Sequence, residues 1–94
     1  MARADFTVGR LSGFECPADR ARAFLWDTGA PGLALRATAA GARAFVFQGR
    51  LRDGCTLRMA IGEPTAWSIP AARAEAWRLR ALIEKGVDPR AARS

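Results

Sequence analysis

The strongest constraint on the fold is a change in the spacing of apolar residues near residue 68. Between residues 33 and 61 apolar and polar side chains alternate, which is the period of a half-buried strand. From Ser68 onward, apolar side chains recur every three or four residues, as on one face of a helix. Ser68 suits the N-cap, Pro70 the first turn and Gly86 the C-terminal stop. The spacing therefore predicts a helix over about residues 69–85, preceded by strands.

Four segments before this helix have the composition of strands. The turn signal "TGAPG" separates the first two, and Asp53-Gly54 is a strong hairpin signal because the favoured turn tolerates positive φ at both positions. The chain of 94 residues is long enough for one domain. We expect an α+β fold, with a three- to four-stranded antiparallel sheet packed on one C-terminal helix in β-β-β-α order. The predicted strands are residues 23–27, 33–38, 43–51 and 55–61.

The alternation assigns the side chains of the sheet to two faces. One face is apolar and should pack on the helix; it carries Leu33, Leu35, Phe45, Phe47, Leu57, Met59 and Ile61. The other face, called the open face below, carries Arg36, Thr38, Val46, Gln48, Arg50, Thr56 and Arg58. We expect Trp26 and Trp67 to close the edges of the core, and Trp77 to be half exposed.

Nearly all of the positive charge of the chain is arginine. Fourteen arginines and Lys85 oppose nine acids, for a net charge of +6, and four of these six charges belong to residues 33–62. The planar guanidinium matches phosphate and guanine edges, and a β face can enter the major groove of DNA. An ordinary solvated sheet face also favours threonine, glutamine and arginine. The pattern alone leaves both interpretations open.

Residue types that most catalytic and metal sites require are missing. The chain has neither histidine nor tyrosine, which removes the commonest general base and a phenolic nucleophile. Cys16 and Cys55 lack the close spacing of a zinc site. We therefore expect no catalytic site, metal, cofactor or small-molecule substrate. Apolar runs fall short of the roughly 20 residues of a membrane span, and no secretion signal is evident, so we expect a protein of the bacterial cytoplasm.

Two long stretches resemble a known family. They are "LWDTGAPGLALRATAAGARAFVFQGRL" and "TLRMAIGEPTAWSIPAARAEAWRLRALIEKGVDPRA". The pattern comprises "WD" before "PGL", an alternating "LxLR", a small loop, an aromatic strand ending in basic residues, a strand closed by "IG", "S" and "AR" opening the helix, and "GxDP" ending it. From about residue 24 to 90 the chain resembles the N-terminal arm-type DNA-binding domain of phage and genomic-island integrases, in the tyrosine recombinase family.

The resemblance implies that the open face binds arm-type sites in the major groove of double-stranded DNA. Arg36, Gln48, Arg50 and Arg58 are at positions suited to that contact. Arg43 alternates in step with Phe45 and so belongs to the apolar face; only its place at the end of the strand lets it reach outward. The predicted DNA-binding residues are Arg36, Thr38, Arg43, Gln48, Arg50, Arg52, Thr56 and Arg58, with further arm contacts from Arg3 and Arg10.

The resemblance also divides the chain. Residues 1–22, broken by Gly9, Gly13 and Pro17, are expected to form an irregular N-terminal arm, with the glycine-rich "FTVGRLSGF" where the family has a short helix. Residues 23–87 would be the DNA-binding domain, and residues 88–94 the start of a linker to the recombinase core.

In this family, catalysis belongs to a separate C-terminal domain that uses arginines, histidine and a tyrosine nucleophile. We therefore interpret the chain as a non-catalytic part of an integrase, whose partners are DNA and other integrase domains or subunits. The alternative is a protein–protein interaction module that acts through the helix face around Trp77, with Arg73, Arg80 and Glu84.

Overall fold

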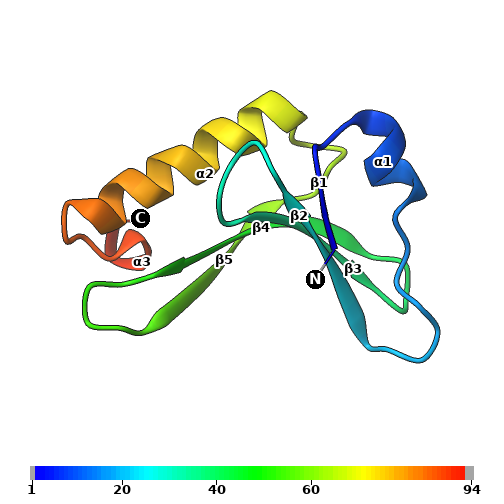
Figure 1. Cartoon of the computed structure of the whole chain (residues 1–94), viewed down its shortest axis with the longest axis horizontal. Coiled ribbons are helices and arrows are strands. Elements are labelled where there is room, and N and C mark those ends of the chain that lie inside the picture. Colours follow the sequence, from blue (N-terminus) through cyan, green and yellow to red (C-terminus); the bar gives the residue numbers. More distant parts are fainter. Residues whose placement is uncertain (1, 93–94) are drawn as a thin grey trace.

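The computed structural model describes residues 2–92, and in that range the chain forms one sheet of five strands and three helices. The strands lie side by side in chain order; β1 is parallel to β2, and the other neighbours are antiparallel. Helices α1 and α2 lie on the same side of the sheet (Figure 1). The elements are β1 (Ala2–Ala4), α1 (Val8–Gly13), β2 (Arg22–Asp27), β3 (Leu33–Thr38), β4 (Arg43–Arg50), β5 (Thr56–Gly62), α2 (Ile69–Glu84) and α3 (Pro89–Ala92).

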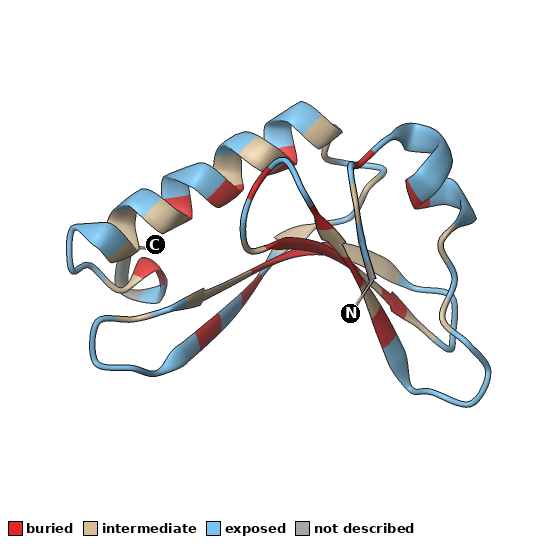
Figure 2. Cartoon of the chain, in the orientation of Figure 1, coloured by how far each residue is buried: buried red, intermediate tan, exposed pale blue. Residues whose placement is uncertain are grey.

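The predicted α+β fold and the antiparallel order of β2 to β5 are confirmed, and the sheet has five strands where three or four were expected. The core lies between the sheet and α2, where the buried residues gather (Figure 2). Leu33, Leu35, Phe45 and Phe47 are fully buried there against Ala72, Ala76 and Leu79 of α2. Each large side chain so buried contributes about 1.5–3 kcal/mol.

Helix α2 begins and ends where the sequence predicts. The Ser68 hydroxyl accepts a hydrogen bond from the Ala71 amide at 3.2 Å, and Pro70 lies in the first turn. At the other end Gly86 adopts φ 83°, and its amide donates to the Ile83 carbonyl while the Val87 amide donates to the Leu82 carbonyl. This pair of bonds is a Schellman motif, which requires a residue that tolerates positive φ.

The hairpin between β4 and β5 is present, but its turn differs from the one expected. Gly54 adopts φ 93°, whereas no other residue type among residues 2–92 has a positive φ, so Asp53 does not. The Gly54 amide donates to the Leu51 carbonyl, and the Cys55 amide donates to the Asp53 carboxylate at 2.9 Å. These bonds define a three-residue loop with glycine in the left-handed region instead of a two-residue turn.

The N-terminal segment is more regular than its glycines suggest. Residues 2–4 pair with β2, and Val8–Gly13 forms α1, whose N-cap Thr7 accepts a hydrogen bond from the Arg10 amide at 3.2 Å. Phe6 and Leu11 are both buried in the main core. They flank the cap at the two positions of a hydrophobic staple, which fixes the start of the helix despite Gly9. Within the described residues, the segment expected to be an irregular arm thus contains a strand and a short helix, and only residues 14–21 between α1 and β2 lack regular structure over a long stretch.

Candidate nucleic-acid interface

The open face of the sheet is concave. The hairpin between β4 and β5 and the far ends of β2 and β3 both bend away from α2, so the sheet arches beneath the helix (Figure 1). Side chains from strands that are distant in the sheet therefore approach one another across the hollow. The clearest case is Arg58 of β5, whose Cζ lies 4.7 Å from the ring centroid of Phe24 in β2.

A cluster of four side chains occupies the centre of this face; we call it the central cluster. It consists of Phe24, Trp26, Gln48 and Arg58. The Phe24 and Trp26 rings stack with centroids 6.1 Å apart and planes 24° apart. Arg58 donates from Nε and from Nη2 to the same oxygen, Oε1 of Gln48, at 3.1 and 2.5 Å. The guanidinium is thus held between a ring face and an amide.

Two small residues of the open face are fully buried next to this cluster. Ala34 and Val46 have no exposed surface, although the alternation of side chains along β3 and β4 points both of them away from α2. In the pairing of the strands they continue the row that begins with Trp26, in the order Trp26, Ala34, Val46 and Ala60. The open face therefore has an apolar floor of its own.

The prediction for Trp26 was wrong. Expected at the edge of the core, it lies on the open face with Phe24. The signal was present in "AFLWD". Successive residues of a strand point to opposite faces of the sheet, so Phe24 and Trp26 share one face, and Leu25 and Asp27 share the other, buried face. Trp67, by contrast, packs partly buried against the core, as predicted.

Around the central cluster lie polar residues of the predicted set. Arg36 sits between Phe24 and Ala44 in the strand register, and Arg50 pairs with Thr56 near the hairpin. Within residues 2–92, the structure shows no side-chain hydrogen bond or ion pair for Arg36, Arg50 or Thr56. Their polar groups are available to a ligand. Thr38 has a structural role, because its hydroxyl accepts a hydrogen bond from the Ala42 amide at 3.1 Å and closes the turn between β3 and β4.

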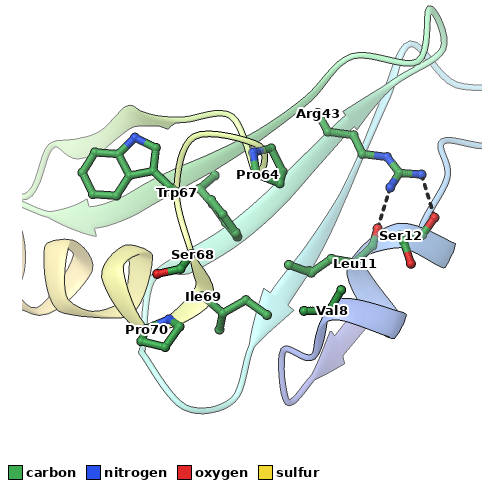
Figure 3. A pocket seen from close by; sticks show the side chains of 10 residues that line it. Val8, Leu11, Ser12, Arg43, Pro64, Trp67, Ser68, Ile69 and Pro70 are labelled. Atoms are coloured by element: carbon green, nitrogen blue, oxygen red, sulfur yellow. Dashed lines mark hydrogen bonds between the residues drawn. The ribbon is translucent and has the colours of Figure 1, made fainter.

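The structure places two other predicted residues away from this group. Arg43 has the parity of Phe45 and reaches α1, where Nη1 and Nη2 donate to the carbonyls of Leu11 and Ser12 at 2.7 and 3.1 Å (Figure 3). Arg52 donates to the carbonyl of Glu84 at the end of α2. Both side chains therefore bond to backbone carbonyls near a helix C-terminus, where intrahelical donors run out. These contacts hold both guanidinium groups on the helix side of the sheet, whereas Arg36 and Arg58 belong to the opposite face in the strand register.

The two arm residues are on opposite sides of the sheet. Arg3 is exposed and its register partner in β2 is Trp26, so it extends the open face at the β1 edge. Arg10 belongs to α1, on the α2 side, and its Nη1 donates to the carbonyl of Asp5 at 3.0 Å. Of the two, the fold brings only Arg3 to the central cluster.

A buried ion pair holds β2 against α2. Both carboxylate oxygens of Asp27 accept from Arg73, at 2.7 Å from Nε and 3.0 Å from Nη2, and the amides of Phe6 and Gly29 donate to Oδ1. Burial alone raises the pKa of Asp27, but the hydrogen bonds from Arg73, Gly29 and Phe6 outweigh it and hold that pKa below its ordinary value. Arg73 is therefore engaged inside the fold, although the sequence assigned it to the helix face around Trp77, and the ion pair was not predicted.

An apolar pocket of about 340 Å³ lies on the helix side of the sheet. Side chains from α1, β4 and the segment leading into α2 surround it, among them Val8, Leu11, Trp67 and Ile69 (Figure 3). Its position separates it from the open face. Trp77 is also on the helix side, on the outer surface of α2, and is 50% exposed, as predicted.

Comparison with known proteins shows the family of the chain. Residues 7–94 match the family described as Arm DNA-binding domain, and the chain belongs to that family. It is therefore a DNA-binding domain of α+β fold. The whole chain is 49% identical to prophage integrase IntF of Escherichia coli (strain K12), and it spans 20% of that protein's length. None of the helices within residues 2–92 is long and apolar enough to cross a membrane.

Proposed function

We propose that this chain is a non-catalytic module of a phage-type integrase that binds double-stranded arm-type DNA sites through the open face of its sheet. Its role would be to deliver the recombinase to accessory sites during site-specific recombination. The observation that carries the proposal is the strand register, which assigns Arg36, Arg50 and Arg58 to the face of the sheet opposite the one that packs on α2. Membership of the arm DNA-binding family supports DNA as the ligand.

The chemistry of the face suits the major groove. Arginine and glutamine side chains reach the donors and acceptors of base edges there, and a β-ribbon fits the groove width. Arg3 at the β1 edge, and Arg50 with Thr56 near the hairpin, lie at the margins of the face, where phosphates of the two strands would pass. We propose Arg3, Arg36, Gln48, Arg50, Thr56 and Arg58 as the contact residues.

The proposed binding unit is larger than the predicted 23–87. Phe6 and Leu11 are part of the core, and Asp5 and Phe6 bond with Arg73 and Asp27, so β1 and α1 belong to the same folded body. We further propose that residues 88–94 begin the connection to other integrase domains. Within that segment Pro89–Ala92 forms α3, and residues 93–94 lie outside the described residues.

Two paired variants test the use of the open face. Arg36→Ala with Arg50→Ala removes two charges from the open face, and Arg78→Ala with Arg80→Ala removes the same charge from α2. Fluorescence anisotropy with a 20-base-pair duplex at fixed salt should show a loss of affinity of at least about tenfold for the first pair and less than about threefold for the second. Equal losses would contradict binding through the open face.

The alternative role as a protein-interaction module has one specific observation in its favour. Trp77 is half exposed on the outer surface of α2, and tryptophan and arginine are frequent interface anchors. Arg80 lies one turn further along the helix, with its guanidinium 3.8 Å from Glu84. If this surface joins subunits, sedimentation velocity without DNA should show concentration-dependent association that Trp77→Ala abolishes. A monomer at all concentrations would remove self-association as a role for Trp77.

A further inference from the structure

The guanidinium of Arg58 lies over the middle of the open face, although β5 is an edge strand. Its Cζ is 4.7 Å from the ring centroid of Phe24 in β2, three strand positions away, because the curvature of the sheet brings the two side chains together across the hollow. Residues at the margin of such a face meet phosphates, and residues at its centre meet the floor of the groove. The location of Arg58 therefore favours a base edge over the DNA backbone.

The contacts of Arg58 hold it in one orientation without using all of its donors. The guanidinium carbon lies over the Phe24 ring, and Gln48 Oε1 accepts from Nε and Nη2. Within residues 2–92, the structure shows no hydrogen bond from Nη1. The end of the fork, with the Nη1 hydrogens and the outer Nη2 hydrogen, is thus left for a ligand with two adjacent acceptors.

Among the base edges of the major groove, guanine offers two adjacent acceptors, N7 and O6, without a donor between them. Adenine pairs one acceptor with a donor, and cytosine presents a donor. We infer that Arg58 reads a guanine of the bound site, and that Gln48 and Phe24 act as positioning residues which fix its guanidinium before DNA arrives. The inference rests on the proposed function and deepens it by naming the base and the residue that reads it.

Preorganisation explains why an aromatic pair lies on a face that binds a polyanion. A free arginine side chain loses considerable rotamer freedom when it binds, and a stacked one has already lost it. The Trp26 ring stacks with the Phe24 ring, with centroids 6.1 Å apart. The apolar floor at Val46 and Ala34 keeps water from the inner side of the cluster.

The test uses a duplex selected by the 94-residue protein itself from a random library. Each guanine of that duplex is then replaced in turn by 7-deazaguanine, which lacks the N7 acceptor but pairs normally with cytosine. For the wild-type protein, replacement of one particular guanine should lower the affinity about tenfold more than replacement of any other guanine. Arg58→Lys keeps the positive charge but lacks the planar two-point donor group. In this variant, replacement of that guanine should lower the affinity no more than replacement of the others.

Two more variants separate positioning from general stability. Phe24→Leu should keep most of the affinity for scrambled duplex. In this variant, replacing the sensitive guanine by 7-deazaguanine should lower the affinity by only about threefold or less. Arg3→Ala, the control on the same face, should weaken all duplexes alike and leave the tenfold sensitivity intact. Thermal unfolding of each variant checks that the fold is retained.

The outcomes distinguish this inference from the proposed function. If the library yields no enriched duplex, sequence-preferring binding itself fails, and the inference with it. If a duplex is enriched but Arg58→Lys shows the same sensitive guanine as the wild type, the domain reads DNA and Arg58 does not read that base. If Arg58→Ala weakens every duplex equally, Arg58 contacts phosphate, and the inference is overturned.

Discussion

The carboxylate of Asp27 and the guanidinium of Arg73 form a two-point ion pair between β2 and α2, 46 residues apart in the chain. The Asp27 side chain is completely buried, and that of Arg73 is 29% exposed. A third bond from Arg73, at 2.8 Å to Asp5, joins the N-terminal segment to the same helix. The pair therefore connects three elements that sequence reasoning treated separately.

Arg73→Ala should destabilise the fold substantially. Removing one partner leaves a buried carboxylate without its counter-ion, which costs about 3 kcal/mol in buried pairs, and somewhat less here because Arg73 is partly solvated. Urea unfolding followed by tryptophan fluorescence measures the free energy of unfolding. Arg78→Ala is the matched control, because Arg78 pairs with Glu75 on the exposed side of the same helix and should cost at most about 0.5 kcal/mol. Similar costs for the two variants would show that the buried pair is not special.

Stability should fall in acid because of Asp27. Its pKa is lower in the folded chain than the ordinary value of 3.8, so the folded state binds this proton less readily than the unfolded state. The resulting stabilisation is fully present above the unfolded pKa and is lost as the pH falls through the lower folded pKa. Asp27→Asn should therefore flatten the decline in the free energy of unfolding below about pH 4. An NMR titration of the Asp27 carboxyl with a midpoint above 3.8 would contradict this account.

Two glycines should respond in opposite ways to alanine. Gly32 has φ 88°, and a Cβ there would lie 2.4 Å from the backbone oxygen of Gln48, so Gly32→Ala should cost at least about 2 kcal/mol. Gly9 lies within α1 with open space around it, and Gly9→Ala should stabilise by up to about 1 kcal/mol. Thermal unfolding compares the two. Loss of stability for Gly9→Ala would show that α1 is not formed as described.

The salt dependence of DNA binding should reflect the arginines that face outward. Arg43 and Arg52 donate to backbone carbonyls, which leaves Arg3, Arg36, Arg50 and Arg58 on the open face. If Arg3, Arg36 and Arg50 displace counterions from phosphates while Arg58 contacts a base, log affinity should fall against log salt with a slope of about −3. Arg3→Ala should make the slope shallower by about one. A slope near zero would exclude phosphate contacts as the source of affinity.

The sequence predicts the sheet, the helix and both faces because alternation and capping are local properties. The strands β3 and β4 and helix α2 follow from the spacing of residues such as Leu33, Phe45 and Ser68. The helix α1 could have been predicted from Phe6, Thr7 and Leu11, which mark a capped helix start, but Gly9 and Gly13 outweighed them.

The partners of individual arginines could not be predicted in the same way. Arg43 donates to carbonyls 32 and 31 residues away, and Arg52 to a carbonyl 32 residues away, so only the packing of the helices decides their roles. The contact between Arg58 and Phe24 depends on the curvature of the sheet, which brings β5 and β2 together across the hollow. Alternation assigns a side chain to a face but not to a neighbour.

The most direct test of the account is an NMR titration of the labelled chain with the selected duplex and with a scrambled duplex of equal length. We predict shifts concentrated on the open face, including the side-chain signals of Gln48, Arg58 and Trp26, and larger for the selected duplex. Shifts centred on Trp77 and the outer surface of α2, with the open face unchanged, would contradict the proposal that this face binds DNA.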